Sequence, residues 1–156
     1  MSGPAETVLV TGASGFIGSA LVQHLMDTRV PVIPTARART DTLSDHFGME
    51  VLPLDVMGDL TLRDAEFHAA TTLVHCATPN DIQSRGEDGG LPLATHGTYR
   101  LIEHAAKHGI RRIVYLSTLQ VYGTELQGTI DETTPVNCET AYGLNHYLGE
   151  EVCRLA

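Results

Sequence analysis

The sequence predicts a doubly wound α/β domain, in which helices cover both faces of a parallel β-sheet. Short apolar segments that suit strands alternate along the chain with segments of helical periodicity, which favours right-handed βαβ crossovers. A glycine-rich segment, residues 11–18, follows the first apolar segment and leads into the first amphipathic helix. A strand, a glycine-rich turn and a helix in this order are typical of Rossmann-like domains.

Five strands and four longer helices are expected, from short apolar segments and from amphipathic periodicity. The expected strands cover residues 8–10, 30–34, 50–54, 72–76 and 112–116. The expected helices cover residues 15–28, 60–69, 93–108 and 142–155, with a short helical turn near 42–47. A Rossmann-like sheet has the strand order 3-2-1-4-5 and a ligand crevice where that order reverses, above the first and fourth strands.

Length, charge and cysteine usage narrow the class of protein. A chain of 156 residues is expected to form one domain with a buried core. The formal net charge of −9 argues against general binding of nucleic acid or of an anionic membrane. No apolar segment approaches the length of a membrane span, and the first residues do not resemble a signal peptide, so a cytoplasmic location is expected. Cys76, Cys138 and Cys153 lack disulfide or metal-ligand spacing and are expected to be reduced thiols.

The glycine-rich segment is the first candidate site. Gly12 permits a tight turn, Gly15 lets the main chain approach a phosphate without a Cβ in the way, and Gly18 packs the helix close to the strand. The N–H groups at a helix N-terminus bind anions, so the segment predicts a nucleotide site rather than a plain turn. The remaining predicted contacts of this loop are Ser14, Phe16 and Ile17.

Two histidines on the expected helix at 93–108 have the spacing of a metal pair. His104 and His108 lie at positions i and i+4, on the face opposite the inward stripe that contains Leu101 and Ala105. The sequence offers no evident third ligand nearby. They are therefore interpreted as two solvated histidines near a helix C-terminus, and no metal is predicted.

Several motifs in order along nearly the whole chain resemble one family. They are residues 11–18, 54–56, 73–77, 97–123 and 140–143. Together they resemble the extended short-chain dehydrogenase/reductases, the NAD(P)-dependent epimerase/dehydratase group that acts largely on nucleotide sugars. The resemblance implies that residues 1–156 are an NAD(P)-binding domain, and it implies a small-molecule substrate such as a nucleotide-linked sugar.

The resemblance also implies how a cofactor would bind. Asp55 is expected to accept a hydrogen bond from the adenine amino group, with the Val56 backbone beside it, and Ala77 ends the strand under the cofactor. NAD selection normally uses an acidic residue at the end of the second strand, whereas arginine accommodates a 2′-phosphate. This chain has Arg37 and Arg39 there and no acid, which favours NADP over NAD, with Arg37 as the phosphate contact.

Tyr142 matches the position of the family's catalytic base, and Thr118 matches the Ser/Thr that hydrogen-bonds the reacting oxygen. A tyrosine, with an ordinary pKa of about 10, can exchange a proton with a substrate hydroxyl if that pKa is lowered. Without the resemblance, the two residues would be interpreted as a packed tyrosine and a turn-forming threonine.

Three departures from the family pattern bear on activity. His146 stands where the family has a lysine that binds the nicotinamide ribose and favours tyrosinate, so its place in the catalytic group is altered. Ala94 stands where the family usually has an asparagine. The chain ends at residue 156, before the region that builds most of the sugar pocket. It therefore resembles the N-terminal half of an enzyme: a fragment, a degenerate gene product or a subunit completed by another chain.

The leading functional hypothesis is an NAD(P)-dependent epimerase/dehydratase or reductase with weakened or incomplete catalysis. The alternative is a nucleotide-binding or regulatory module without turnover, and a relic fold that binds nothing is a third. The resemblance implies a homodimer formed through the helices at 93–108 and 142–155. The polar segment 79–90 is expected to line the pocket mouth and to move.

Overall fold

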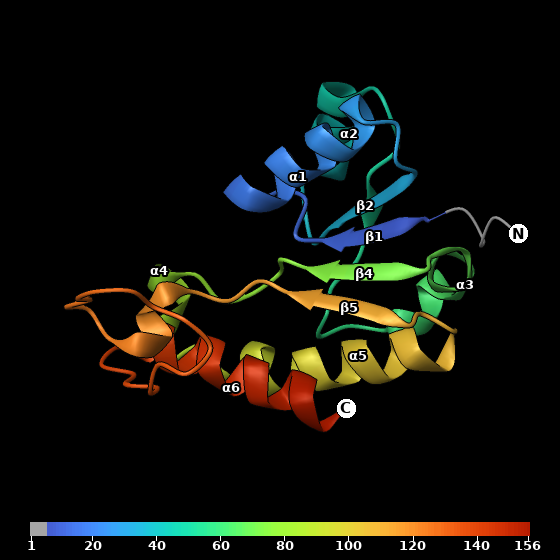
Figure 1. Cartoon of the computed structure of the whole chain (residues 1–156). Coiled ribbons are helices and arrows are strands. Elements are labelled where there is room, and N and C mark those ends of the chain that lie inside the picture. The colour runs from blue at the N-terminus through green and yellow to red at the C-terminus, as the bar shows by residue number, and fades with distance from the viewer. Residues whose placement is uncertain (1–5) are drawn as a thin grey trace, which may run out of the picture. The chain divides into compact units, whose positions relative to one another are not determined.

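The computed structural model describes residues 6–156 and confirms the predicted sheet. Within that range one sheet contains five parallel strands in the order β3-β2-β1-β4-β5. The strands are β1 (Val8–Thr11), β2 (Val32–Ala36), β3 (Leu52–Pro53), β4 (Thr72–His75) and β5 (Arg112–Tyr115). Figure 1 shows β4 and β5 side by side and pointing the same way. The predicted order 3-2-1-4-5 is correct.

The helices follow the predicted alternation but are more divided. In chain order they are α1 (Phe16–Asp27), α2 (Thr40–Phe47), the 3₁₀ turn η1 (Leu60–Arg63), α3 (Asp64–Ala69), α4 (Asp81–Ser84), the π-helical turn η2 (Leu93–Gly97), α5 (Thr98–Lys107), the 3₁₀ turn η3 (Leu119–Tyr122) and α6 (Ala141–Leu155). In the described part of the chain, none of these helices is long and apolar enough to cross a membrane.

Contacts divide the chain into two compact units. The first contains the chain through Ala77 together with Arg100–Tyr115, and the second contains Thr78–Tyr99 together with Leu116–Ala156. The sheet belongs to the first unit, and α6 belongs to the second. The N-terminal residues of α5, Thr98 and Tyr99, are counted with the second unit.

The core of the first unit lies on both faces of the sheet. Val8 and Val10 of β1 pack with Val22 of α1 and Phe47 of α2, and all four are buried. Leu9 points to the opposite face because side chains alternate along a strand, and it is 0% exposed. A parallel sheet with both faces buried is the arrangement that the apolar strand pattern predicts.

The bounds of β2 and β3 differ from the prediction for local reasons. Val30, expected to begin the second strand, instead donates its backbone N–H to Leu25 O at 2.9 Å and closes the C-terminus of α1. The third strand is reduced to the pairs Thr35–Leu52 and Ala36–Pro53. Pro34 and Pro53 have no N–H to donate, so proline limits the hydrogen bonds available to this edge of the sheet.

The second unit is organised around α6, which packs against α4, η2 and η3. Thr140 caps α6 by accepting a hydrogen bond from the Gly143 N–H at 3.0 Å. Residues 80–84, expected to be a moving loop, contain a short helix with a capping box, in which the Asn80 and Gln83 side chains each accept from the other's backbone N–H. The segment 79–90 is therefore more structured than its polar composition indicates.

Candidate functional site

The glycine loop of the first unit lies between β1 and α1, as predicted. Gly12 has a φ of +77°, a conformation that favours glycine. A Cβ on Gly12 would lie 2.8 Å from the carbonyl carbon of Cys76 and 2.8 Å from the Ala77 nitrogen. Only a glycine fits here, because the loop passes directly against the end of β4.

Gly18 and Gly15 have different roles in the same loop. A Cβ on Gly18 would lie 2.2 Å from Gly12 O, so this residue lets the first turn of α1 pack on the loop. Gly15 is exposed, has an ordinary φ of −82°, and a Cβ there would lie 3.3 Å from Gly12 O. The fold therefore requires Gly18 much more strongly than it requires Gly15.

The N-terminus of α1 is open to a ligand. No side-chain hydrogen bond from within residues 6–156 caps it at Gly15, and its first residue, Phe16, is 93% exposed. The first N–H groups of a helix have no partner within the helix and carry its positive dipole end. With Ser14 and Ile17 also exposed, this turn can bind an anion.

The other predicted cofactor residues also follow the carboxyl ends of strands in the first unit. Arg37 comes directly after β2 and is exposed. Asp55 follows β3, and one of its carboxylate oxygens accepts from the Met57 N–H at 3.0 Å, while Val56 is buried. Ala77 follows β4, and its N–H donates to Thr11 Oγ1 at 3.4 Å. Carboxyl ends of parallel strands share one edge of the sheet, where ligands bind in open α/β sheets.

A buried polar pair at this edge was not predicted. Thr11 and His75 are neighbours in the register of β1 and β4, and Thr11 Oγ1 lies 2.7 Å from His75 Nδ1. Both residues are buried. The strand order and register together would have identified the pair, since each residue occupies the last position of its strand.

The predicted catalytic residues Thr118 and Tyr142 lie on connected elements of the second unit. Thr118 caps η3, and its hydroxyl accepts from the Gln120 N–H at 3.4 Å, which leaves the O–H able to donate. Tyr142 is the second residue of α6 and is half-buried. The start of α6 is attached to η3, because the Thr140 hydroxyl lies 2.8 Å from Gln120 Oε1 and a Cβ on Gly143 would lie 2.5 Å from Gln120 O.

His146 lies beside Tyr142 but is buried. The two rings make an edge contact with centroids 4.6 Å apart, and His146 is 1% exposed. Its Nδ1 lies 3.1 Å from Leu116 O. Burial lowers the pKa of His146, against the opposing effects of the Leu116 and Pro79 carbonyls and of the Glu150 carboxylate. The neutral imidazole is therefore the favoured form at neutral pH.

Two further residues pack in the second unit. Ala94, where the resemblance leads us to expect an asparagine, is 0% exposed within η2. Asn145, which the sequence analysis did not single out, is a buried polar residue that is 1% exposed. Its side-chain amide donates to Ser84 Oγ at 3.0 Å and to Gly89 O, which ties the segment 79–90 to α6.

The expectation that His104 and His108 are solvated was wrong. Their side chains are 13% and 12% exposed, and both rings contact the ring of Phe67 on α3. Asp64, also on α3, lies beside both of them. Helical periodicity assigned these histidines to an outward face, but α3 covers that face.

The comparison with known proteins decides the family. The NAD dependent epimerase/dehydratase family matches residues 8–156, nearly the whole chain. The chain belongs to this family. The open helix N-terminus and the glycine loop described above occur within the matched residues.

Curated relatives are about a quarter to a third identical to this chain over the segments that align. The human (Homo sapiens) UDP-glucose 4-epimerase is 28% identical over 172 residues, which cover 96% of this chain and 48% of that enzyme. Dihydroflavonol 4-reductase of Dianthus caryophyllus is 32% identical over 145 residues, covering 84% of this chain and 39% of that enzyme. The chain thus spans about half the length, or less, of these relatives.

Solved structures also match nearly the whole of this chain and about half of the other protein. The dTDP-glucose 4,6-dehydratase DesIV of Streptomyces venezuelae, solved with NAD and TYD bound, has a TM-score of 0.83 and 26% identity, over 96% of this chain and 51% of that one. The UDP-glucuronic acid 4-epimerase of Bacillus cereus, solved with UDP-glucuronic acid and NAD, has a TM-score of 0.75 and 25% identity, over 96% and 51%.

Proposed function

We propose that this chain is the dinucleotide-binding half of an NAD(P)-dependent oxidoreductase of the epimerase/dehydratase type. The observation that carries the proposal is the cradle at the start of α1. Gly12 and Gly18 are positions where a Cβ would overlap backbone atoms, and the helix N-terminus beside them is exposed. The solved relatives, which hold NAD, support the same assignment.

The residues of the first unit fit a dinucleotide. The N–H groups at Phe16 and Ile17 would bind the pyrophosphate, with Ser14 beside them and without a side chain at Gly15 to block the approach. Asp55 has a second carboxylate oxygen that can accept from the adenine amino group, and the Val56 backbone would flank the base. When bound, the cofactor supplies hydride transfer.

The form of the cofactor depends on the charge after β2. Arg37 is exposed at that point, and its guanidinium can form bidentate hydrogen bonds with a 2′-phosphate. A ribose 2′-hydroxyl would lack the acidic partner that usually selects NAD. We therefore propose a preference for NADP over NAD, with NAD as the alternative.

A titration of the 156-residue chain with NADPH and NADH by calorimetry tests both proposals. Tighter binding of NADPH, reduced to the level of NADH in Arg37→Ala, supports the phosphate contact. Arg39→Ala is the matched control, because Arg39 is equally exposed in the same turn. Equal affinities for the two cofactors would refute the charge argument, and binding of neither would refute the dinucleotide site.

The proposed chemistry of the second unit is proton transfer at a hydroxyl of a nucleotide-linked sugar. The Tyr142 hydroxyl would hold or release the proton of the reacting hydroxyl, and the Thr118 O–H would donate to the same oxygen. The nucleotide sugars bound to solved relatives support this substrate class.

A second candidate function is dinucleotide binding without turnover. The burial of His146, with Nδ1 at a backbone carbonyl, favours it, because a neutral imidazole does not stabilise tyrosinate as a lysine ammonium does. His146→Lys distinguishes the two candidates through the ultraviolet titration of Tyr142 in the cofactor complex. A shift to lower pH supports a latent catalytic group, whereas an unchanged titration favours a binding module.

We also propose a homodimer formed through the helices at 93–108 and 142–155. On α6, Leu144 is 43% exposed, an apolar side chain suited to an interface. Light scattering should give twice the chain mass of 16.8 kDa, and Leu144→Glu should return the value to that of one chain. A single-chain mass for the unmodified protein would refute the dimer.

A further inference from the structure

Two neighbouring helices of the first unit bring three metal-ligating side chains together. Asp64 belongs to α3, His104 belongs to α5, and His108 follows directly after the last residue of α5. Asp64 Oδ1 lies 3.0 Å from His104 Nε2 and 3.2 Å from His108 Nε2. One ligand atom from each of the three residues lies within 4.8 Å of both others.

The hydrogen bonding of His108 leaves a lone pair directed at the carboxylate. Its Nδ1 lies 2.8 Å from His104 O, and a carbonyl oxygen can only accept, so this nitrogen carries the hydrogen. In the neutral ring Nε2 is then an acceptor, 3.2 Å from the Asp64 oxygen, which is also an acceptor. Two facing acceptors repel each other unless a positive charge lies between them.

One polar atom of His104 and one of Asp64 lack a hydrogen-bond partner within residues 6–156. His104 Nε2 and Asp64 Oδ1 are buried atoms that form no hydrogen bond of acceptable geometry within the described residues, although they are 3.0 Å apart. Buried polar atoms nearly always have a partner.

The separations suit a shared metal ion. Zinc binds histidine nitrogen and carboxylate oxygen at about 2.0–2.2 Å in tetrahedral geometry, so neighbouring ligand atoms lie roughly 3.3 Å apart. The separations of 3.0 and 3.2 Å between Asp64 Oδ1 and the two histidine nitrogens are close to that value. The hydrogen on His108 Nδ1, bonded to a backbone carbonyl, is the orienting contact that metal-bound histidines usually make.

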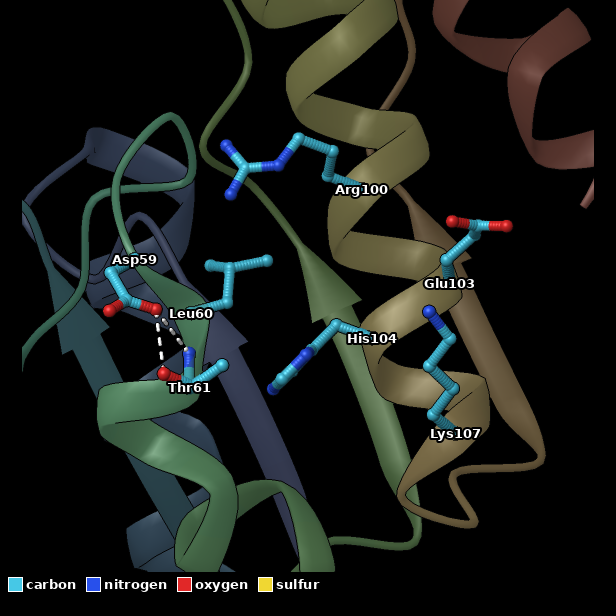
Figure 2. A pocket seen from close by; sticks show the side chains of 7 residues that line it. All are labelled: Asp59, Leu60, Thr61, Arg100, Glu103, His104 and Lys107. Carbon is cyan, nitrogen blue, oxygen red and sulfur yellow. Dashed lines mark hydrogen bonds between the residues drawn. The ribbon is translucent and has the colours of Figure 1, made fainter.

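An ion could reach this cluster from solvent. The Asp64 side chain is 48% exposed. His104 also lines a hollow of about 170 Å³ together with Asp59, Thr61, Arg100 and other residues. Figure 2 shows the His104 ring extending from α5 towards Thr61, on the opposite wall of this hollow.

We propose that Asp64, His104 and His108 form a binding site for a divalent zinc-like ion, with water in the fourth position. The sequence predicts no metal because it offers no evident third ligand near the histidine pair. The third ligand lies on α3 instead. Bound zinc would connect α3 to α5 through both histidines and the carboxylate.

Titration of the metal-stripped 156-residue chain with Zn²⁺ by calorimetry tests the site. One ion per chain is expected, and Asp64→Asn or His104→Gln should each weaken binding by about 100-fold or more, beyond the loss typical of an outer-shell change. His46→Gln is the matched control, because His46 is an exposed helical histidine on α2 and its loss should leave the affinity unchanged.

The spectrum of Co²⁺ bound in place of zinc provides a second readout. Intense visible bands indicate tetrahedral coordination, and they should disappear in Asp64→Asn while its circular dichroism stays that of the unmodified chain. The absence of stoichiometric Zn²⁺ binding by the folded chain would overturn the proposal. An equal loss of affinity in His46→Gln and Asp64→Asn would overturn it too, and the charge between the three side chains would then be a proton.

Discussion

Replacing Gly15 with valine separates the ligand-binding role of the glycine loop from its structural role. Gly15 is the N-cap of α1, is exposed and has a φ of −82°, which valine can adopt. A Cβ there would contact only Gly12 O, at 3.3 Å, so the loop must yield by a few tenths of an ångström. The branched side chain would then occupy the space from which a pyrophosphate reaches the helix N–H groups.

The two effects differ in size. Valine is a poorer N-cap than glycine, which together with the close contact costs about 1 kcal/mol of stability, or roughly 2–4 °C in melting temperature for a chain of this size. A phosphate moved out of reach loses at least two hydrogen bonds to a charged group, worth about 1.5–3 kcal/mol each. The dissociation constant of NADPH should therefore rise by about 100-fold or more.

Two control variants bracket this experiment. Gly86→Val introduces a Cβ 3.2 Å from Gln83 O, a comparable contact outside the glycine loop, and it should leave NADPH affinity within about twofold because Gly86 is no part of the phosphate site. Gly18→Ala introduces a Cβ 2.2 Å from Gly12 O, and the overpacking should cost about 1–3 kcal/mol of stability or more.

Calorimetry with NADPH and differential scanning calorimetry of the same samples give the two quantities. The reasoning is refuted if Gly15→Val binds NADPH as tightly as the unmodified chain while it remains folded. It is also refuted if Gly18→Ala melts at the same temperature as the unmodified chain, because the backbone overlap at Gly12 would then have no energetic consequence.

Three other predictions follow from the second unit. Asn145→Ala should lower stability by about 1–3 kcal/mol, because it leaves the buried Ser84 hydroxyl and the half-buried Gly89 carbonyl without this donor, and limited proteolysis should show faster cleavage within residues 79–90. Burial lowers the pKa of His146 below 6.5, so the unfolded chain binds more protons at this residue than the folded chain does. The urea midpoint of unfolding should therefore fall as the pH drops below about 6.5, and His146→Gln should weaken that dependence. A midpoint that does not change with pH would contradict the prediction. Burial, assisted by Glu150, raises the pKa of Cys153 to about 11, so alkylation at pH 8 should be roughly 100-fold slower in the folded chain than in urea, as mass spectrometry of the modified peptide can measure.

The sheet was predictable because its signals are local. Each strand is an apolar segment, and the tight turn between β1 and α1 is indicated by the glycines that the sequence has there. The errors occur where a local pattern competes with a neighbouring element. Val30 was predicted to begin the second strand, but its N–H bonds to the last turn of α1. The expected helix at 93–108 begins with a π-helical turn. Periodicity alone does not resolve such boundaries.

Some residues of the candidate site were predictable from the sequence and others were not, for the same reason. The residues proposed to bind the cofactor belong to a contiguous motif and to segments that follow strands, so the order of elements predicts where in the fold they lie. Asn145 and Asp64 were missed because their partners are distant in the sequence. Asn145 bonds to Ser84 and Gly89, and Asp64 lies beside one histidine in α5 and one directly after it. Pairing of this kind depends on how helices pack, and a single sequence carries no direct signal for it.

The backbone constrains the glycine loop of the first unit more strongly than it constrains position 146 on α6. The cradle of the first unit depends on glycines that the backbone requires, since Gly12 and Gly18 leave no room for a Cβ. On α6, the His146 imidazole lies beside the Leu116 carbonyl and packs against the Tyr142 ring. A histidine at position 146 is therefore compatible with a packed α6. We therefore expect that replacing His146 would leave the proposed dinucleotide binding intact, whereas replacing Gly12 or Gly18 would disturb both that binding and the fold.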